Sequence, residues 1–366
     1  MARGEAPITR VRARAYTIPT DKPEADGTYA WGSTTLVVVH LEGGGKTGLG
    51  YTYTHGSVVA LIDSKLNEVV TGTDAMDTPG AYAAMHRAVR NIGRQGLAAT
   101  AISAVDAALW DLKAKLLDLP LCSVLGRLRD EVPIYGSGGF TSYSLDELTE
   151  QLAGWVERDG CSFVKMKIGT HPQDDPARVA KAKIAIGENA TLFVDANGAF
   201  TAKQALAMAE VFEAYRVGWF EEPVSSDDLA GLRLLRERAP VCMDIAAGEY
   251  GYEIDYYRRM LTAGAVDVVQ ADVTRCGGVT GFLQVATLSD ARHTDLSGHC
   301  APALHLHAAC AASRLRHLEW FHDHVRIEHM LFDGAPVPKD GTIAPDLTRP
   351  GHGLTFKEKD AEHFAS

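Results

Sequence analysis

The stretch FVKMKIG, residues 163–169, places two lysines one residue apart within an otherwise apolar run. In a β-strand, alternate side chains point to opposite faces, so Lys165 and Lys167 would share one face. Turn-rich segments, RDGCS before it and GTHP after it, predict a buried strand with defined ends. Buried lysines are rare unless they are paired or take part in chemistry. The two lysines therefore indicate a site in the interior of the fold.

Seven further short apolar runs continue the same rhythm along the chain. They are VPIYGSGG (132–139), TLFVDANG (191–198), VGWFEEP (217–223), PVCMDIAAGE (240–249), VDVVQADV (266–273), DLSGHC (295–300) and HLEWF (317–321). Amphipathic stretches such as TAKQALAMAEVFEAY lie between them. Eight strands that alternate with helices predict parallel βαβ units closed into a barrel. A doubly wound open sheet is the alternative, but no GxGxxG motif follows a first strand here.

The segments on either side of the barrel differ from it in pattern. Residues 1–125 begin with alternating strands that turn through glycines 43–45 and end in helical periodicity, which predicts an α+β domain. The run GGGKTG is no phosphate loop, because the first glycine of that motif would fall at His40. We expect the barrel to span 126–325. The turn-rich segment 326–366 is expected to return to the first domain.

Composition excludes several classes of partner. The 366 residues are 46% hydrophobic and 23% charged with a net charge of −11, which is ordinary for a globular protein and unfavourable for nucleic-acid binding. No apolar run reaches the ~18 residues of a membrane span, and the N-terminus lacks a signal-peptide core. Six cysteines without a CxxC pair predict free thiols. These features predict a cytoplasmic protein without membrane partners; a homo-oligomer is compatible with them, although no interface pattern is evident.

Chemically active residues stand at or near the ends of the predicted strands. In chain order they are Lys165 and Lys167, Asp195, Glu221, Glu249, Asp272, His299 and Glu319. From Lys167 onward, successive members are separated by 20 to 28 residues, the length of one βα unit. The C-terminal strand ends of a barrel converge at one mouth, where barrel enzymes carry their active sites. We therefore expect these side chains to meet.

Three of these residues suggest a metal site. Asp195, Glu221 and Glu249 offer only carboxylate oxygens, the ligands that a hard cation such as Mg²⁺ prefers. Without a cation, three converging carboxylates would repel one another. A second possibility, a metal held by His322 and His324 in FHDH, is disfavoured because nothing nearby in the sequence completes such a site.

The remaining members suggest acid–base chemistry. A desolvated lysine beside a divalent cation can have a pKa low enough for it to act as a base. His299 could be oriented by Asp272 from the neighbouring strand, which would fix its tautomer and basicity. The strands that carry Lys167 and His299 lie on opposite sides of the predicted mouth.

With these residues at these positions, the chain resembles the enolase superfamily, and within it the mandelate racemase subgroup. The matching pieces are ALWDLKAK, VKMKIG, VDANG, FEEP, AGE, DVTRCGGVTG, SGHC and EW, in this order over nearly the full length. The resemblance implies a (β/α)₇β barrel with an N-terminal α+β capping domain and one Mg²⁺ on Asp195, Glu221 and Glu249. It further implies removal of the proton α to a carboxylate, through a metal-stabilised enediolate, by Lys167 or His299.

The resemblance also gives roles to the other residues. Lys165 would lie beside the substrate carboxylate. In the mechanism we expect, Glu319 hydrogen-bonds to that carboxylate from the eighth strand, as a donor if it is protonated. Relatives that resemble muconate-lactonizing enzymes carry a lysine where this chain has Asp272, which disfavours that branch.

The segment 19–33, PTDKPEADGTYAWGS, falls where the family's capping domain covers the active site. It carries four charged residues, Asp21, Lys22, Glu24 and Asp26, beside the aromatic residues Tyr29 and Trp31. We expect the two aromatic residues to contact the substrate. A polar cover suits a polyhydroxy acid better than an aryl acid. The sequence thus predicts dehydration of a small sugar acid to a 2-keto-3-deoxy acid. The first alternative function is that of a racemase or epimerase that uses Lys167 and His299 as opposed bases. The second alternative is a non-catalytic barrel that binds acids.

Overall fold

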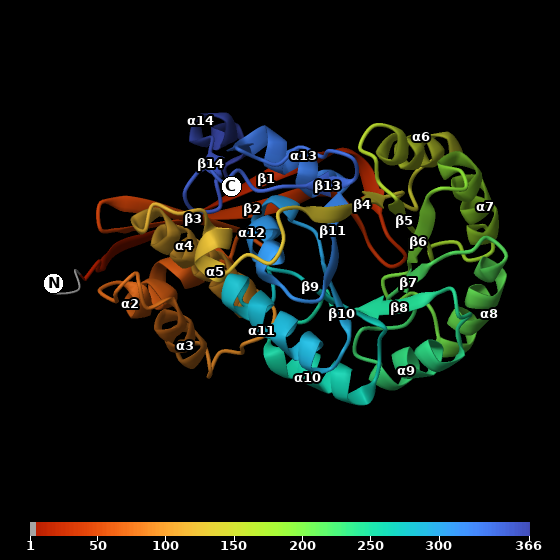
Figure 1. Cartoon of the computed structure of the whole chain (residues 1–366), viewed down its shortest axis with the longest axis horizontal. Coiled ribbons are helices and arrows are strands. Elements are labelled where there is room, and N and C mark those ends of the chain that lie inside the picture. The colour runs from red at the N-terminus through yellow and green to blue at the C-terminus, as the bar shows by residue number, and fades with distance from the viewer. Residues whose placement is uncertain (1–4) are drawn as a thin grey trace.

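The computed structural model describes residues 5–366 as a barrel with a smaller domain packed beside it (Figure 1). The smaller domain contains β1 (Ile8–Ala25), β2 (Ala30–Gly43), β3 (Lys46–Tyr53), α1 (Val58–Leu61), η1 (Ile62–Leu66), α2 (Asn67–Val70), α3 (Thr78–Ala88), α4 (Leu97–Leu116) and α5 (Leu121–Leu125). No helix in the described part of the chain has the length and apolar character needed to cross a membrane.

Eight parallel strands close the barrel. They are β4 (Val132–Gly138), β5 (Phe163–Lys167), β6 (Thr191–Asp195), β7 (Trp219–Glu221), β8 (Asp244–Ala247), β9 (Val268–Ala271), β10 (Asp295–Gly298) and β11 (Leu315–Phe321). Each strand pairs with the next in sequence, and β11 pairs with β4 to complete the circle. The closed barrel confirms the predicted fold class and rules out the open sheet.

Seven helices connect the barrel strands and form its outer layer. They are α6 (Leu145–Glu157), α7 (Asp175–Ile186), α8 (Ala202–Glu213), α9 (Leu229–Arg238), α10 (Ile254–Ala263), α11 (Gly278–Ala291) and α12 (Pro302–Ala311). The starts of α6 and α8 are fixed by capping boxes, in which Ser144 pairs with Glu147 and Thr201 with Gln204.

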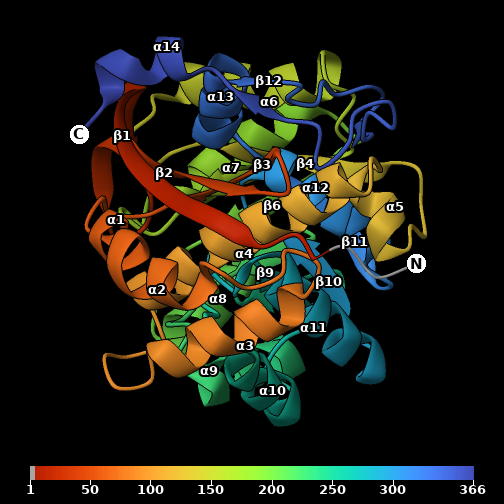
Figure 2. The same cartoon turned by 90° about the vertical axis from the view of Figure 1, so that its left-hand side faces the viewer.

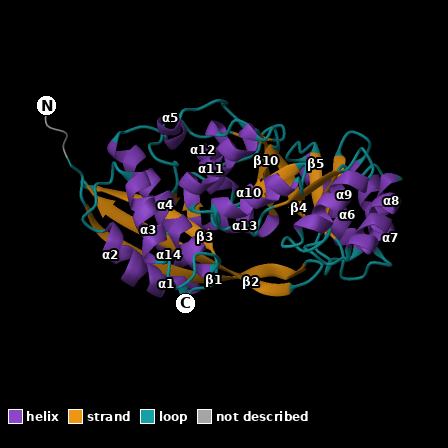
Figure 3. Cartoon of the chain, turned by 90° about the horizontal axis from the view of Figure 1, so that it is seen from below, coloured by secondary structure: helices purple, strands orange, loops and turns teal. Residues whose placement is uncertain are grey.

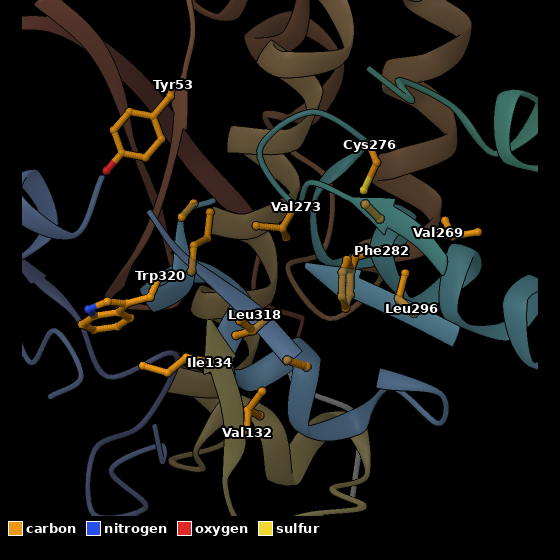
Figure 4. Packing of buried hydrophobic residues seen from close by; sticks show 14 of the residues in the cluster. Tyr53, Val132, Ile134, Val269, Val273, Cys276, Phe282, Leu296, Leu318 and Trp320 are labelled. Atoms are coloured by element: carbon orange, nitrogen blue, oxygen red, sulfur yellow. The ribbon is translucent and has the colours of Figure 1, made fainter. Parts of the chain in front are cut away.

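Period-two alternation divides the barrel side chains into two sets. Outward-facing residues such as Ile134, Val269 and Leu318 belong to the large core cluster between strands and helices (Figure 4). Tyr135, Phe193, Trp219, Ala246 and Val268 form a separate buried cluster, with Phe163 packed against it. The rings of Phe193 and Trp219 stack at 5.1 Å. An aromatic layer therefore fills the barrel two residues below the charged strand ends.

The smaller domain packs its three-stranded antiparallel sheet against the long helix α4 (Figure 2). The sheet order is β1-β2-β3, and the turn between β2 and β3 contains Gly44 and Gly45, as the sequence predicts. Helix and sheet approach closely at Gly50, where a Cβ atom would lie 2.1 Å from the backbone oxygen of Ala104. Small residues on both sides thus set this spacing.

The β1–β2 hairpin extends from the smaller domain to the barrel mouth (Figure 3). At its tip, the backbone oxygen of Asp26 accepts hydrogen bonds from the hydroxyls of Thr141 and Thr170, at 2.9 and 2.7 Å. The hydroxyl of Thr28 contacts the backbone oxygen of Asn197 at 3.4 Å. These contacts anchor the tip on the loops after β4, β5 and β6, so the smaller domain covers the barrel as a capping domain.

The segment after the barrel contains α13 (His322–Leu331), β12 (Phe332–Asp333), β13 (Thr342–Ile343), β14 (Thr355–Phe356), α14 (Glu358–Ala361) and η2 (Glu362–Phe364). It contacts both parts of the protein. Strand β13 pairs with β4, whereas Phe356 packs on Tyr16 of β1 with ring centroids 5.2 Å apart. The domain boundaries expected near residues 125 and 325 stay predictions.

Candidate active site

Three carboxylates meet at the C-terminal ends of neighbouring barrel strands. The parallel register places Lys167 of β5 opposite Asp195 of β6, and Asp195 opposite Glu221 of β7. Glu249 lies two residues beyond the end of β8. One oxygen from each of the three acids lies within 4.8 Å of the others, and all three side chains are buried. Such a group can hold one hard cation through oxygen ligands alone.

The backbone before Glu249 requires glycine. Gly248 has a φ of +136°, and a Cβ atom there would lie 2.2 Å from the backbone oxygen of Gln270. A side chain at this position would meet both strain and a clash. The glycine therefore lets the chain turn at the end of β8 and direct Glu249 into the barrel.

Lys165 and Lys167 point into the barrel from one face of β5, as the alternation predicts. Lys165 Nζ lies 2.5 Å from Glu221 Oε1 and 2.8 Å from Glu319 Oε1. It also lies 3.5 Å from Asp195 Oδ2, which is 2.5 Å from Lys167 Nζ. Burial would favour neutral amines, but the carboxylates raise the pKa of both lysines above the usual value. Both side chains are therefore charged in this arrangement.

His299 and Asp272 form a hydrogen-bonded pair at the ends of β10 and β9. His299 Nδ1 lies 2.8 Å from Asp272 Oδ2. The other oxygen of Asp272 accepts from the N–H and the hydroxyl of Thr274, each at 2.7 Å, which fixes the carboxylate. Burial would lower the pKa of His299, but Glu249, Glu319 and Asp272 raise it well above its usual value. The pair leaves His299 Nε2 free of Asp272 and 3.1 Å from Glu249 Oε2.

Glu319 is held by donors on both of its oxygens. Oε1 accepts from the hydroxyl of Ser137 at 2.6 Å and faces Lys165. Oε2 accepts from the backbone N–H of Cys300 at 3.0 Å. Burial would raise the pKa of Glu319, but the charges of Lys165 and His299 lower it below its usual value. Glu319 is thus an ionised acceptor here.

A cavity of about 460 Å³ opens between the barrel mouth and the capping domain. The barrel contributes Lys167, Asn197, Glu249, Tyr250, Arg275, His299, Cys300, Glu319, Phe321 and His324. The capping domain contributes Asp26, Tyr29, Trp31, Ser33, Thr34, Thr35, Tyr53, Thr54 and His55. The volume is suitable for a small organic acid.

Four of the predicted site residues do not line this cavity, one of which is Asp272, buried behind His299. Lys165, Asp195 and Glu221 are fully buried, because their opposite charges draw them together into ion pairs. The predicted contact of Lys165 with a substrate carboxylate therefore stays a prediction.

Tyr29 and Trp31 line the cavity where the sequence places them. Trp31 Nε1 donates to Glu24 Oε2 at 2.8 Å, and the indole packs edge-on against Phe140 with centroids 5.7 Å apart. Tyr29 stacks on Trp31 at 6.2 Å. Burial and the charge of Asp323 raise the pKa of Glu24 to about 8. Glu24 therefore supports an aromatic wall and does not itself line the cavity.

Most charges of segment 19–33 do not reach the cavity, contrary to the sequence-based expectation. Asp21 contacts His322 Nε2 at 3.1 Å, and Lys22 donates to Glu147 at 2.8 Å. Only Asp26 of the four charged side chains lines the cavity. The cover is therefore less charged than its sequence suggests, because its ionic groups are paired with the barrel around it.

The two histidines of FHDH do not form a common site. His322 contacts Asp21, whereas His324 stacks on Tyr53 with ring centroids 3.5 Å apart. His324 Nδ1 accepts from the backbone N–H of Ala301 at 3.3 Å, and burial lowers its pKa to about 3. His324 is therefore a neutral member of the cavity wall.

Sequence reasoning missed two ionisable neighbours of the three carboxylates Asp195, Glu221 and Glu249. Arg275 Nη1 lies 3.5 Å from Glu249 Oε1, and its Nε lies 3.4 Å from Asp272 Oδ2. Glu222 is buried with a φ of +36°, and burial followed by Glu249 raises its pKa well above the usual value. Glu222 stands beside Glu221 in FEEP, and Arg275 lies in DVTRCGGVTG, so both could have been noticed from the matching pieces.

Two family profiles together cover most of the chain. Residues 11–126 match the mandelate racemase / muconate lactonizing enzyme N-terminal domain, and residues 147–360 match the enolase C-terminal domain-like family. This protein therefore belongs to the mandelate racemase / muconate lactonizing enzyme family within the enolase superfamily.

Individual relatives agree with this assignment. A mandelate racemase/muconate lactonizing enzyme-like protein from Rubrobacter xylanophilus shares 52% identity over 98% of this chain and 100% of its own, with a TM-score of 0.96. The 3,6-anhydro-α-L-galactonate cycloisomerase of Streptomyces coelicolor is 34% identical over 95% of this chain and 97% of its own. L-talarate/galactarate dehydratase from Salmonella typhimurium, in a structure with Mg and L-lyxarohydroxamate, is 27% identical over 99% and 93%, with a TM-score of 0.89. Sugar-acid dehydratases and cycloisomerases are thus its relatives.

Proposed function

We propose that the protein is a Mg²⁺-dependent enzyme that removes the proton α to the carboxylate of a sugar acid and expels the β-hydroxyl, giving a 2-keto-3-deoxy acid. The observation that carries this proposal is the cluster of three buried carboxylates between Lys167 on one side of the barrel mouth and His299 on the other. A metal site flanked by two proton carriers is suited to elimination next to a carboxylate.

The residues present fit the cation. Asp195, Glu221 and Glu249 supply only hard oxygen donors, and their oxygens converge within 4.8 Å. Glu249 Oε2 is buried and receives no well-directed hydrogen bond, although His299 lies close to it. A buried carboxylate oxygen without a donor is costly unless a cation satisfies it. Mg²⁺ held there would supply positive charge that acidifies the α-proton of a bound carboxylic acid.

Lys167 and His299 would divide the proton transfers. Lys167 is charged while Asp195 is its ion-pair partner, and its pKa would fall once Asp195 is engaged by Mg²⁺. In its neutral form Lys167 then takes the α-proton, and the electrons of the broken C–H bond form a C=C bond as the β C–O bond breaks. His299 gives its proton to the departing hydroxyl, so that water leaves. Asp272 orients His299 and stabilises its charged form through the 2.8 Å hydrogen bond. The resulting enol tautomerises to the 2-keto acid.

Kinship supports the same reaction class. In sequence comparison, L-talarate/galactarate dehydratase is 31% identical to this chain, and D-gluconate dehydratase and arabinonate dehydratase are each 29% identical. The Salmonella dehydratase structure contains Mg. A second candidate is cycloisomerisation, favoured by the 34% identity to the Streptomyces coelicolor cycloisomerase. There the same base and acid would break a C–O bond within a ring, and no water would be lost.

A substrate screen tests the proposal. The purified full chain, with Mg²⁺, is offered a library of sugar mono- and diacids and their anhydro or lactone forms, and 2-keto acid is detected as its semicarbazone. We expect keto acid from at least one compound, its loss in excess chelator and its return with added Mg²⁺. Product mass separates dehydration, which loses 18 Da, from cycloisomerisation and epimerisation, which lose none. Keto acid formation unchanged by chelator would contradict the role of the metal, and a library without any keto acid would contradict the reaction.

A further inference from the structure

The cavity wall contributed by the capping domain carries no ammonium or guanidinium group within residues 5–366. It consists of hydroxyl groups, aromatic rings, one exposed histidine and the carboxylate of Asp26. We propose that the substrate is a sugar acid with a single carboxylate, an aldonate, and that the site discriminates against the matching diacid, an aldarate. This inference rests on the proposed function and names the substrate class for the same site.

The cations that line the cavity, Lys167, Arg275 and protonated His299, all lie on its barrel side. Lys167 Nζ lies 2.5 Å from Asp195 Oδ2, and Arg275 lies 3.5 Å from Glu249 and 3.4 Å from Asp272. They therefore belong to the metal end of the site, where one substrate carboxylate would be held. No cation of the cavity wall is left for a second carboxylate at the other end of the molecule.

The nearest charges of the cover make a distant carboxylate unfavourable. Lys22 could in principle reach toward the cavity, but its Nζ is held 2.8 Å from Glu147 and it does not line the wall. Asp26 does line it, and the N–H groups of Thr28 and Tyr29 fix its carboxylate at 2.6 and 2.7 Å. A terminal carboxylate would lose water beside a like charge, without an ion pair to compensate.

The cavity is also equipped for hydroxyl groups, on the capping-domain wall and at His324 beside it. The Nδ1 atom of His324 accepts from the N–H of Ala301, so the proton of the neutral ring lies on Nε2, for which no described residue is an acceptor. Likewise, His55 Nδ1 accepts from the N–H of Ser57 at 3.1 Å, which leaves Nε2 as the N–H donor of the ring. The hydroxyls of Ser33 and Thr54 also line the cavity. Neutral donors of this kind can bind alcohol groups, and they supply no positive charge to balance a second carboxylate.

Kinship does not decide between the two classes. The relatives include dehydratases of monoacids, D-gluconate and arabinonate, and a dehydratase of diacids, L-talarate and galactarate. For this protein we therefore infer the substrate class from the groups at the far wall of its own cavity.

Matched pairs of acids test the inference. D-Gluconate and D-glucarate, D-galactonate and galactarate, and D-xylonate and xylarate are each compared in 2-keto acid formation and in calorimetric binding, with the full chain and saturating Mg²⁺. We expect kcat/KM for the preferred aldonate to exceed that of its aldarate by at least about 100-fold, since a buried carboxylate would be left unpaired. Calorimetry should rank every pair that binds in the same order.

A cation introduced into the cover provides the converse test. Ser33 is exposed and lines the cavity, so Ser33→Lys adds an ammonium group with little risk to folding, and Ser33→Met is the uncharged control of similar length. We expect Ser33→Lys to tighten aldarate binding by at least about 10-fold, and Ser33→Met to leave the discrimination unchanged.

The outcomes separate the two proposals. An aldarate processed or bound as well as its aldonate, or an equal gain from both Ser33 variants, would overturn the monoacid inference and leave the dehydratase proposal intact. Absence of keto acid from every compound would overturn the dehydratase proposal, and the binding order of the pairs would still decide the monoacid inference.

Discussion

Replacing Lys165 with methionine removes the cation that lies among three buried carboxylates. Lys165 Nζ is 2.5 Å from Glu221, 2.8 Å from Glu319 and 3.5 Å from Asp195, and its side chain has no exposed surface. Methionine keeps a similar length and apolar stem but leaves these carboxylates without their shared partner. The variant therefore isolates the charge from the packing of the side chain.

The expected cost is large because the charge is deeply buried. Breaking a buried ion pair by removing one partner costs about 3–5 kcal/mol of unfolding free energy. We expect a value near the upper end, since three acceptors lose one donor. Burial and Asp195 already raise the pKa of Glu221 to about 8, and Lys165 is the first charge that opposes this shift. Without Lys165, the carboxylates around it would bind protons more tightly in the folded variant than in the unfolded chain. The variant's loss of stability relative to the wild type should therefore grow from pH 5 to pH 8.

Urea denaturation of the variant and the wild type, at both pH values and with or without Mg²⁺, measures these effects. Mg²⁺ should restore part of the stability, because a cation on the same carboxylates replaces some of the missing positive charge. Lys22→Met is the matched control, since it breaks the exposed Lys22–Glu147 pair of 2.8 Å and should change stability very little. Equal, small effects for the two variants, or no response to Mg²⁺, would refute the reasoning.

Three further predictions concern the chemistry. Glu249→Gln should weaken Mg²⁺ binding, measured by calorimetry, by at least about 100-fold, because one anionic ligand is lost; wild-type affinity would exclude Glu249 as a ligand. His299→Asn should abolish dehydration yet still exchange the α-proton with deuterium oxide, observed by NMR, whereas Lys167→Ala should lose exchange; the reverse result would make His299 the base. Asp272→Asn should lower the pKa of His299 and so move the alkaline limb of the pH–rate profile to lower pH, because the acid form is lost earlier; an unmoved limb would contradict the pairing.

The sequence was sufficient to predict the barrel and the meeting of its charged strand ends. Strand alternation placed Lys165 and Lys167 on one face, and the spacing of one βα unit predicted that Lys167, Asp195 and Glu221 would stand side by side. Parallel register makes that spacing meaningful, since equivalent positions on adjacent strands become neighbours. Both results depend only on local periodicity and on the rules of barrel closure.

The contacts between domains could not be predicted in the same way. Charges in the cover were expected to meet the substrate, but Asp21 and Lys22 pair with barrel residues more than a hundred positions away in the chain. Within the barrel, the contacts of Arg275 with Glu249 and Asp272 were missed in the same way, because Arg275 stands in a loop without any periodic pattern. All these contacts depend on the direction that a long side chain takes, and neither spacing nor residue type determines that direction.

The charge balance of the site links the metal to the class of substrate. A divalent cation on Asp195, Glu221 and Glu249 would keep Glu221 ionised. These three carboxylates, with Asp272 and Glu319, then face four protein cations: Lys165, Lys167, Arg275 and protonated His299. Glu222 adds no charge, since burial raises its pKa and favours the neutral acid. One net negative charge is left above an aromatic layer that excludes water, where an unbalanced charge is costly. One divalent cation would convert this to one net positive charge, and the carboxylate of a substrate that binds while Lys167 is still protonated would then neutralise the site. A second carboxylate has no counterpart in this balance, which is the electrostatic reason to expect a monoacid.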